Sequence, residues 1–239
     1  MRTATFFAFV LFMLPVAALA QESGPVTIGG VRYERVDPGE PFQERPAPKP
    51  DWQPPQPTSS ERAAGLLAYI TSDPGQYRPD GVPRPEEHAR ELTAFFTPGE
   101  DEPVWVGTRA LESLKGLAVR VDLADTPVTC DVRHMHFWPQ RTGWRSRQWY
   151  ITPELLLPCR DGRKTVPVTR GVLEERAFDL AAGETAAFWL TLSARPDARP
   201  GLYTARVSIQ AAGKPALVLP MRIEVLPFQL QRPKDRAWL

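Results

Sequence analysis

The feature that most constrains the fold is a run of alternating apolar and polar residues between positions 187 and 230. The run has three segments, separated by turns that contain Pro and Gly. Successive side chains of a strand point to opposite faces, so each segment predicts a strand with one apolar and one wet face. We interpret the run as a meander of three antiparallel strands, with inward positions Phe188, Leu190, Leu192, Tyr203, Ala205, Val207, Ile209, Leu217, Leu219, Met221, Ile223 and Val225.

A ribbon of this kind buries its apolar face only by packing on a second sheet. We therefore predict an all-β fold, an immunoglobulin-like β-sandwich of mainly antiparallel strands. Pro220 lies inside the third segment and cannot donate a backbone hydrogen bond. We expect that strand to lie at a sheet edge or to carry a bulge at this point.

Composition agrees with one main folded domain and excludes some partners. The chain has 239 residues, of which 42% are hydrophobic, enough for a sizeable core. Its 27 prolines oppose long helices. The net charge of +1 gives no electrostatic argument for binding nucleic acid or an anionic membrane surface.

The first 20 residues resemble an export signal. Arg2 precedes an apolar run over residues 6–19, and Ala18-Leu19-Ala20 forms a small-x-small cleavage site. We predict a secretory signal peptide over residues 1–20 and a secreted or periplasmic mature chain without a membrane partner. An uncleaved anchor is the alternative, but the apolar run is short for a membrane span.

Residues 21–60 predict a proline-rich, disordered tether. Prolines are dense from Asp37 to Ser60 and favour extended conformations over ladders or helices. A short alternating piece with a Gly29-Gly30 turn could form a small hairpin, which would be marginal by itself. The functional alternative is a proline-rich recognition peptide.

The β-sandwich domain is expected over residues 61–239. Residues 61–77 could form a short helix or a buried strand, and Pro85 resembles the first turn of a short helix. Further strands are indicated on both sides of Pro98-Gly99 and over 117–123, 166–169 and 176–180. A possible longer strand would carry on one side Val128, Cys130, Val132, His134, His136 and Trp138.

Three motifs carry a resemblance to a known family, at residues 83–123, 149–158 and 194–230. In this order and spacing they resemble the N-terminal β-sandwich region of secreted bacterial proteins similar to glycoside hydrolase family 123. The resemblance covers the chain from about Glu61 to Leu230. It implies a sandwich followed by a large α/β barrel, which carries an adjacent Asp-Glu pair for substrate-assisted cleavage of N-acetylhexosamine glycosides.

The sequence ends near where that barrel would be expected to begin, so no residue here matches the family's catalytic motif. The resemblance therefore implies a non-catalytic domain that supports or docks a catalytic barrel, and not an enzyme. The alternative is a free-standing carbohydrate-binding module. An enzyme that acts alone is the third interpretation, and it has no visible Ser/His/Asp set, metal cluster or phosphate loop to support it.

Two kinds of residue pair are candidates for catalysis or metal binding. Asp101-Glu102 and Glu174-Glu175 are adjacent, and adjacent strand residues point to opposite faces, so we interpret both pairs as solvated. His134 and His136 would share a strand face, as in many metal sites, but no third ligand is evident. We expect a structural pair, partly exposed at a sheet surface, with no metal and no cofactor.

Cys130 and Cys159 are the two cysteines of the chain. Export would place them in an oxidising compartment, so we predict a disulfide between them. The alternative is two separate buried thiols.

The stretch over residues 137–150 is the candidate for contact with a carbohydrate or with a neighbouring domain. Aromatic rings stack on sugars, and arginine donors reach hydroxyl and acid groups. A groove lined by these side chains would favour sugar binding, whereas a flat apolar patch beside residues 226–239 would favour docking. The candidates are Trp138, Arg141, Trp144, Arg147, Trp149 and Tyr150.

Overall fold

The computed structural model describes residues 26–28, 31–33, 43–45, 50–124, 126–143, 146–160, 163–167 and 173–230. The chain divides into two units, Met1–Phe42 and Gln43–Leu239. In the first unit β1 (Val26–Ile28) pairs with β2 (Val31–Tyr33), which is the small hairpin expected from the sequence. The signal peptide lies outside the described residues.

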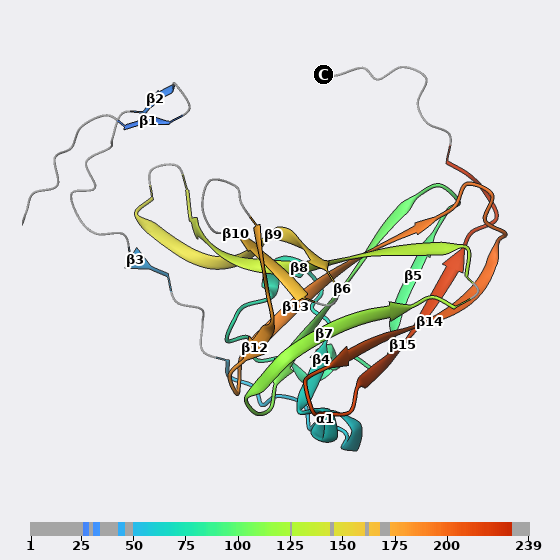
Figure 1. Cartoon of the computed structure of the whole chain (residues 1–239), viewed down its shortest axis with the longest axis horizontal. Coiled ribbons are helices and arrows are strands. Elements are labelled where there is room, and N and C mark those ends of the chain that lie inside the picture. Colours follow the sequence, from blue (N-terminus) through green and yellow to red (C-terminus); the bar gives the residue numbers. More distant parts are fainter. Residues whose placement is uncertain are drawn as a thin grey trace, which may run out of the picture. The chain divides into compact units, whose positions relative to one another are not determined.

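The second unit is an all-β sandwich made of two sheets, as predicted (Figure 1). The larger sheet has the order β11-β10-β9-β8-β13-β6-β4, with β3 paired to β9. Its strands are β3 (Gln43–Glu44), β4 (Leu66–Tyr69), β6 (Asp101–Ala110), β8 (Val128–Arg141), β9 (Gln148–Arg160), β10 (Arg163–Pro167), β11 (Leu173–Arg176) and β13 (Thr185–Ala194). The smaller sheet has the order β12-β7-β14-β15-β5, from β5 (Leu92–Phe96), β7 (Leu114–Asp122), β12 (Phe178–Leu180), β14 (Gly201–Gln210) and β15 (Leu217–Val225).

The main core lies between the two sheets. It contains the alternating apolar side chains of β13, β14 and β15 that the sequence marks as inward, including Phe188, Val207 and Ile223. A second hydrophobic cluster includes Ala187 of β13, and Trp189 of the same strand packs against it. Its other buried members are Leu67, Tyr69, Tyr77 and Met135. The segment after β4 therefore covers part of the other face of the larger sheet, so the face of β13 that we expected to be wet is partly buried.

The predicted three-stranded meander is wrong at its first connection. β13 pairs with β6 and β8 in the larger sheet, whereas β14 and β15 pair with each other in the smaller one. Residues 195–200 thus cross between sheets, and the apolar faces of β13 and β14 meet across the core. Alternation identifies which face of a strand is buried but not which strand is its neighbour.

Pro220 lies on β15, which is an internal strand of the smaller sheet. At this residue, however, β15 is paired only with β14 and not with β5. Pro220 faces Arg206 of β14 in the register. The parallel pairing of β15 with β5 begins only at Met221, opposite Leu92. A residue without an N–H group therefore costs no ladder hydrogen bond toward β5.

Residues 61–77 form both of the alternatives that the sequence left open. Helix α1 (Ser59–Ala64) has Thr58 as its N-cap and ends at Gly65, whose φ of 73° is the left-handed conformation of a helix C-cap. Strand β4 follows at once. Two 3-10 turns, η1 (Pro74–Gln76) and η2 (Pro85–Glu87), complete the segment, so the short helix expected at Pro85 is a single turn.

Part of the predicted tether contacts the folded unit. The indole Nε1 of Trp52 donates to the carbonyl of Val82 at 3.1 Å, and the Arg84 guanidinium lies 4.5 Å from the centre of its ring. Thr58 caps α1. The sandwich unit therefore includes residues before Glu61.

Candidate interaction sites

The aromatic and arginine-rich stretch forms a long hairpin from β8 and β9. The two strands pair from Arg133 opposite Pro158 to Arg141 opposite Trp149, with an irregularity between His136 and Phe137. Near the tip, Thr142 N–H donates to the carbonyl of Gln148 at 2.9 Å.

The register divides the candidate residues between two faces of the hairpin. Trp138 lies opposite Thr152 and Tyr150 opposite Gln140, which puts both rings on one face. Arg141 and Trp149 lie opposite each other on the other face. They therefore do not line one groove, because a shift of one position along a strand reverses the direction of the side chain.

The remaining candidates of this stretch lie at the tip or outside the described residues. The Arg141 guanidinium donates to the carbonyl of Ser146 at 2.9 and 3.1 Å, and Arg147 is exposed. Trp149 is half-buried, and its carbonyl accepts from Arg45 N–H at 2.6 Å. Trp144 is outside the described residues.

Cys130 and Cys159 have free thiols in this structure, so the predicted disulfide is not formed there. Continuing the β8–β9 register by one residue puts Val132 opposite Cys159, and Cys130 lies two residues from Val132 on the same face. The two cysteines are thus diagonal neighbours, which are about 7–8 Å apart in a sheet. A disulfide needs a closer approach of the two backbones.

Both thiols are poor nucleophiles in this setting. Burial, with the nearby Asp131 carboxylate, raises the pKa of Cys130 to about 12. Burial and the same carboxylate raise the pKa of Cys159 to about 11. Neither group carries a thiolate at neutral pH.

The histidine pair is oriented differently from our expectation. His134 and His136 do share one face of β8, with ring centres 5.7 Å apart, but His134 is buried between the sheets, not exposed at a surface. It is buried because its ring points toward the smaller sheet, where it packs against the ring of Phe178. Among the described residues no group of three His, Cys, Asp or Glu side chains could hold a metal ion.

The carboxylate pair Asp101-Glu102 lies at the start of β6. Asp101 is exposed, and its Oδ1 accepts a hydrogen bond from the Ser193 hydroxyl. Glu102 faces Leu192 of β13 in the register. The side chains of Glu174 and Glu175 lie outside the described residues.

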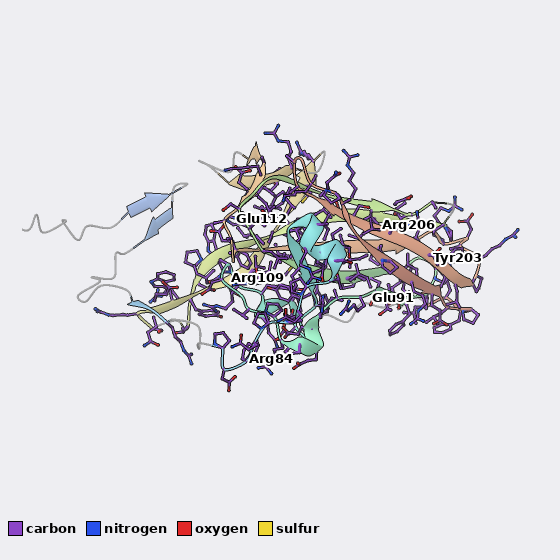
Figure 2. The ribbon with its side chains drawn as sticks, turned by 90° about the horizontal axis from the view of Figure 1, so that it is seen from below. Arg84, Glu91, Arg109, Glu112, Tyr203 and Arg206 are labelled. Atoms are coloured by element: carbon purple, nitrogen blue, oxygen red, sulfur yellow. The ribbon has the colours of Figure 1, made fainter. Side chains whose placement is uncertain are left out.

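A cavity of about 420 Å³ lies beside Trp52. Tyr69 lines it, and the Tyr69 hydroxyl donates to Thr185 Oγ1 at 3.2 Å. Burial raises the pKa of Tyr69 to about 12, so the phenol stays neutral. Arg78 also lines the cavity, and its Nε is buried with no hydrogen-bond partner among the described residues. Arg84 also lines the cavity, and the Arg109 guanidinium donates to the carbonyl of Gly81, another lining residue, at 2.5 Å; both arginines are labelled in Figure 2.

Exposed apolar side chains flank the last residues of β15 in the register or follow them in the chain. Phe95 and Leu202 both flank Glu224 of β15 in the register and point outward with it. Phe95 is 66% exposed and Leu202 is 71% exposed. Phe228 and Leu230 follow just after β15 and are 54% and 62% exposed. We call these four side chains the apolar end patch; Tyr203, the neighbour of Leu202, is labelled in Figure 2.

Comparison with known proteins gives likeness of fold only. No family model matches the sequence, and no curated protein matches it. A family 123 glycoside hydrolase from Clostridium perfringens matches at 10% identity and a TM-score of 0.47, over 68% of this chain and 27% of that chain.

Two other solved structures match similarly. A PapD-like domain of human CEP192 matches at 9% identity and a TM-score of 0.29, over 67% of this chain and 92% of that one. The class 5 fimbriae chaperone CfaA matches at 15% identity and a TM-score of 0.23, over 58% of this chain and 55% of that one. At these values none of the matches carries an argument about function.

In the part of the chain that the structure describes, every helix is too short or too polar to cross a lipid bilayer.

Proposed function

We propose that the second unit is a non-catalytic β-sandwich domain of a secreted or periplasmic glycoside-hydrolase-like protein, and that it packs against a neighbouring catalytic barrel. The resemblance of residues 83–123, 149–158 and 194–230 suggests the kind of parent protein. The apolar end patch is the observation that carries the docking role.

The patch is unusual for the outer face of a sheet. Two of the four outward positions of β15, Arg222 and Glu224, are charged, as expected for a strand that faces water, and the other two are Val218 and Pro220. Phe95 and Leu202 stand on either side of Glu224 and remain exposed. Clustered exposed apolar side chains mark interaction surfaces more often than single ones do.

Chain connectivity favours a covalently joined domain as the occupant of the patch. Leu226 N–H donates to the carbonyl of Phe96 at 3.0 Å, so the chain leaves β15 beside β5. Phe228 and Leu230 then follow on the same exit. A domain attached to this exit would be held at high effective concentration next to Phe95 and Leu202.

The test is to read the gene past the Leu239 codon and to produce the longer chain. We expect an in-frame barrel, and we expect hydrogen exchange in β5 and at the start of β14 to be slower in the longer chain than in residues 1–239. The double variant Phe95→Ser, Leu202→Ser should remove this protection. Val218→Ser is the matched control, because Val218 is also outward and exposed on β15 but lies at its other end.

Two results would refute the proposal. One is a stop codon directly after Leu239. The other is a longer chain in which β5 and the start of β14 exchange as fast as they do in the 239-residue chain.

A second candidate function, carbohydrate binding, is favoured by the cavity beside Trp52. It combines aromatic walls from Trp52 and Tyr69 with the Nε of Arg78, which has no hydrogen-bond partner among the described residues. A saccharide hydroxyl or carboxylate would satisfy that donor. Calorimetry with neutral and acidic oligosaccharides tests this role. Binding should be lost in Arg78→Met and retained in the exposed-arginine control Arg120→Met; absence of binding by the unmodified chain would reject it.

A further inference from the structure

The cavity beside Trp52 has walls from two separate parts of the chain. One wall is the turn over residues 78–81, between η1 and η2, and the other is the segment around Trp52, which the sequence assigns to the proline-rich tether. The volume of about 420 Å³ is in the range of pockets that hold small ligands, about 300–1,000 Å³. The groups that the two walls present decide what kind of ligand fits.

The turn in the cavity wall is held firmly in place. Gly81 N–H donates to the carbonyl of Arg78 at 3.0 Å, which closes the turn. The carbonyl of Pro79 accepts from Thr185 N–H at 2.7 Å. The carbonyl of Gly81 accepts from the Arg109 guanidinium at 2.5 Å. The side chains of the turn therefore project from a backbone that is anchored to β13 and β6.

The same turn presents one donor and one acceptor to the cavity. Arg78 lines the cavity, and its Nε is buried without a hydrogen-bond partner among the described residues. Asp80 is exposed and also lines the cavity, and within the described part of the chain its carboxylate forms no hydrogen bond or ion pair. A ligand that enters here thus meets an unpaired N–H donor and an unpaired carboxylate acceptor.

The charges that line the cavity are balanced. Arg78 and Arg84 are its two lining cations, and Asp80 and Glu87 are its two lining carboxylates. Burial raises the pKa of the Tyr69 hydroxyl, and both carboxylates are close enough to it to add to this effect. The carboxylates would repel an anionic ligand, and the guanidinium groups would repel a cationic one. The balance favours a neutral ligand.

Trp52 adds an aromatic surface to the second wall. Its indole Nε1 donates to the carbonyl of Val82 at 3.1 Å, and the Arg84 guanidinium lies over the ring, 4.5 Å from its centre. One face of the ring is therefore covered, and a ligand packs against the other. Sugars combine apolar C–H faces, which pack on aromatic rings, with hydroxyl groups that both donate and accept hydrogen bonds. A neutral sugar thus matches the aromatic surface, the donor and the acceptor together.

We propose that the ligand of this cavity is a neutral saccharide and not an acidic one, which rests on the carbohydrate-binding role suggested above for the same cavity. One sugar hydroxyl accepts from Arg78 Nε–H, another donates to the Asp80 carboxylate, and a sugar ring packs against Trp52. The segment around Trp52 is then part of the binding site and not a passive tether. Saccharide binding and the docking of this segment therefore stabilise each other.

Calorimetry with matched pairs of trisaccharides tests this assignment. The neutral members are β-1,4-linked mannotriose and cellotriose. The acidic members are trimannuronate and triglucuronate of the same linkage, which carry a carboxylate in place of each hydroxymethyl group. We expect at least one neutral trisaccharide to bind, and to bind at least tenfold more tightly than its acidic counterpart at the same ionic strength.

Variants locate the site and the source of the preference. Asp80→Asn should reduce the preference for the neutral sugar, because it removes a charge that repels the uronate and keeps an acceptor oxygen. The matched control is Asp197→Asn, an exposed carboxylate between β13 and β14 that does not line the cavity. Trp52→Ala should abolish binding, and Trp52→Phe, which keeps a ring, should retain it. Trp138→Ala, at the exposed tryptophan of the β8–β9 hairpin, should leave binding unchanged.

The possible failures are distinguishable. If neither neutral trisaccharide binds, the carbohydrate-binding role fails together with the assignment. If an acidic trisaccharide binds as tightly as its neutral counterpart, the role stands and the assignment to neutral sugars is overturned. Loss of binding in Trp138→Ala and not in Trp52→Ala would place the site on the β8–β9 hairpin and would also overturn it. Docking at the apolar end patch is independent of each of these results.

Discussion

Gly107 of β6 has no room for even one methyl group. A Cβ atom at this position would lie 2.3 Å from Cε1 of Tyr77 and 3.0 Å from Cε1 of Tyr69. Tyr77 is fully buried and its hydroxyl donates to the carbonyl of Tyr69 at 3.1 Å, so the ring is held in place. The glycine allows the segment after β4 to pack directly on the larger sheet.

We therefore predict that Gly107→Ala lowers the free energy of unfolding by about 2 kcal/mol, as expected for overpacking of a filled core. Denaturation with guanidinium measures the change. Gly143→Ala is the control, because its nearest neighbour, the Cβ of Ser146, would be 4.0 Å away. Equal stability of the two variants would contradict the close approach of Tyr77.

The cysteines give a prediction about redox state. Because Cys130 and Cys159 are diagonal on neighbouring strands, we expect both thiols to remain free in protein purified without reductant. Alkylation after unfolding, followed by intact-mass measurement, should show two modified cysteines. A mass without any modification would establish the disulfide predicted from export, and would require β8 and β9 to be closer at this point than described.

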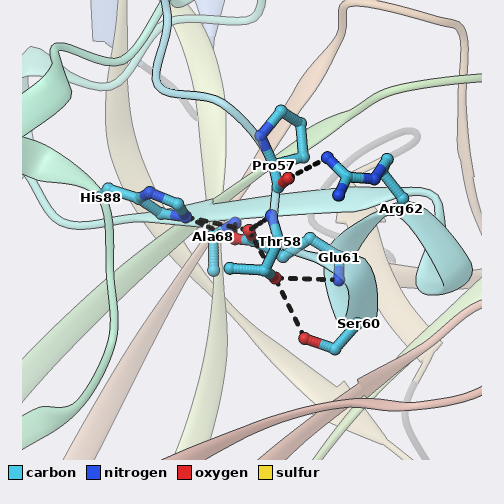
Figure 3. A network of polar contacts seen from close by, with 7 residues as sticks. All are labelled: Pro57, Thr58, Ser60, Glu61, Arg62, Ala68 and His88. Carbon is cyan, nitrogen blue, oxygen red and sulfur yellow. Dashed lines mark hydrogen bonds and ion pairs between the residues drawn. The ribbon is translucent and has the colours of Figure 1, made fainter.

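Helix α1 is only six residues long, and one buried carboxylate joins it to the sandwich. Glu61 is almost fully buried, and its Oε2 accepts from Thr58 N–H at 2.8 Å while its Oε1 accepts from Ala68 N–H at 3.2 Å. His88 Nε2 lies 2.8 Å from the same Oε1 (Figure 3). Thr58 precedes α1, Ala68 belongs to β4 and His88 follows η2, so this network connects α1 to β4 and to the residue after η2.

We predict that Glu61→Gln destabilises the protein by about 2 to 3 kcal/mol at neutral pH, because an amide nitrogen would face the donors of Thr58 or Ala68. Burial raises the pKa of Glu61, but the hydrogen bonds from Thr58, His88 and Ala68 lower it by more. The net pKa is therefore below the ordinary value of 4.5. The carboxylate therefore stabilises the fold above about pH 4.5, and this contribution is lost as the pH falls through the folded-state pKa.

Denaturation of both proteins across the acidic range measures this effect, and the difference between them should shrink below pH 4.5. Glu100→Gln is a matched control: Glu100 Oε2 accepts from Thr97 N–H and Oγ1, but it is only partly buried and has no histidine partner. We expect a smaller loss of stability there. A pH-independent difference for Glu61→Gln would show that the loss is one of packing and not of charge.

For the whole molecule, the boundary of the folded unit determines which fragment is stable. A chain that begins at Gln43 keeps Trp52 on Val82 and Thr58 as the cap of α1, whereas a chain that begins at Glu61 loses both. We predict that the first fragment unfolds at the same guanidinium concentration as the full chain, and that the second is less stable by about 1 to 2 kcal/mol. Equal stability of the two fragments would place the boundary at Glu61 after all.

Much of the fold follows from local pattern. The inward positions of β13, β14 and β15 and the shared face of β8 from Val128 to His136 follow from a period of two residues. β4 is buried at all four of its positions, so it shows no such period, and the sequence left open whether its segment forms a helix or a strand. The cap at Thr58 was not predicted, although Thr58 followed three residues later by Glu61 is the sequence signature of a capping box. The signal peptide and the secreted location remain predictions.

Only the tertiary structure decided which strands are neighbours and which side chains meet. β13 and β14 follow each other along the chain and have the same pattern, yet they belong to different sheets, because either arrangement would bury the same apolar faces. The split of Trp138 and Tyr150 from Arg141 and Trp149, the diagonal placement of Cys130 and Cys159, and the burial of His134 all depend on register between strands far apart in sequence. Local alternation carries no information about that register, since it is selected by the packing of the whole core.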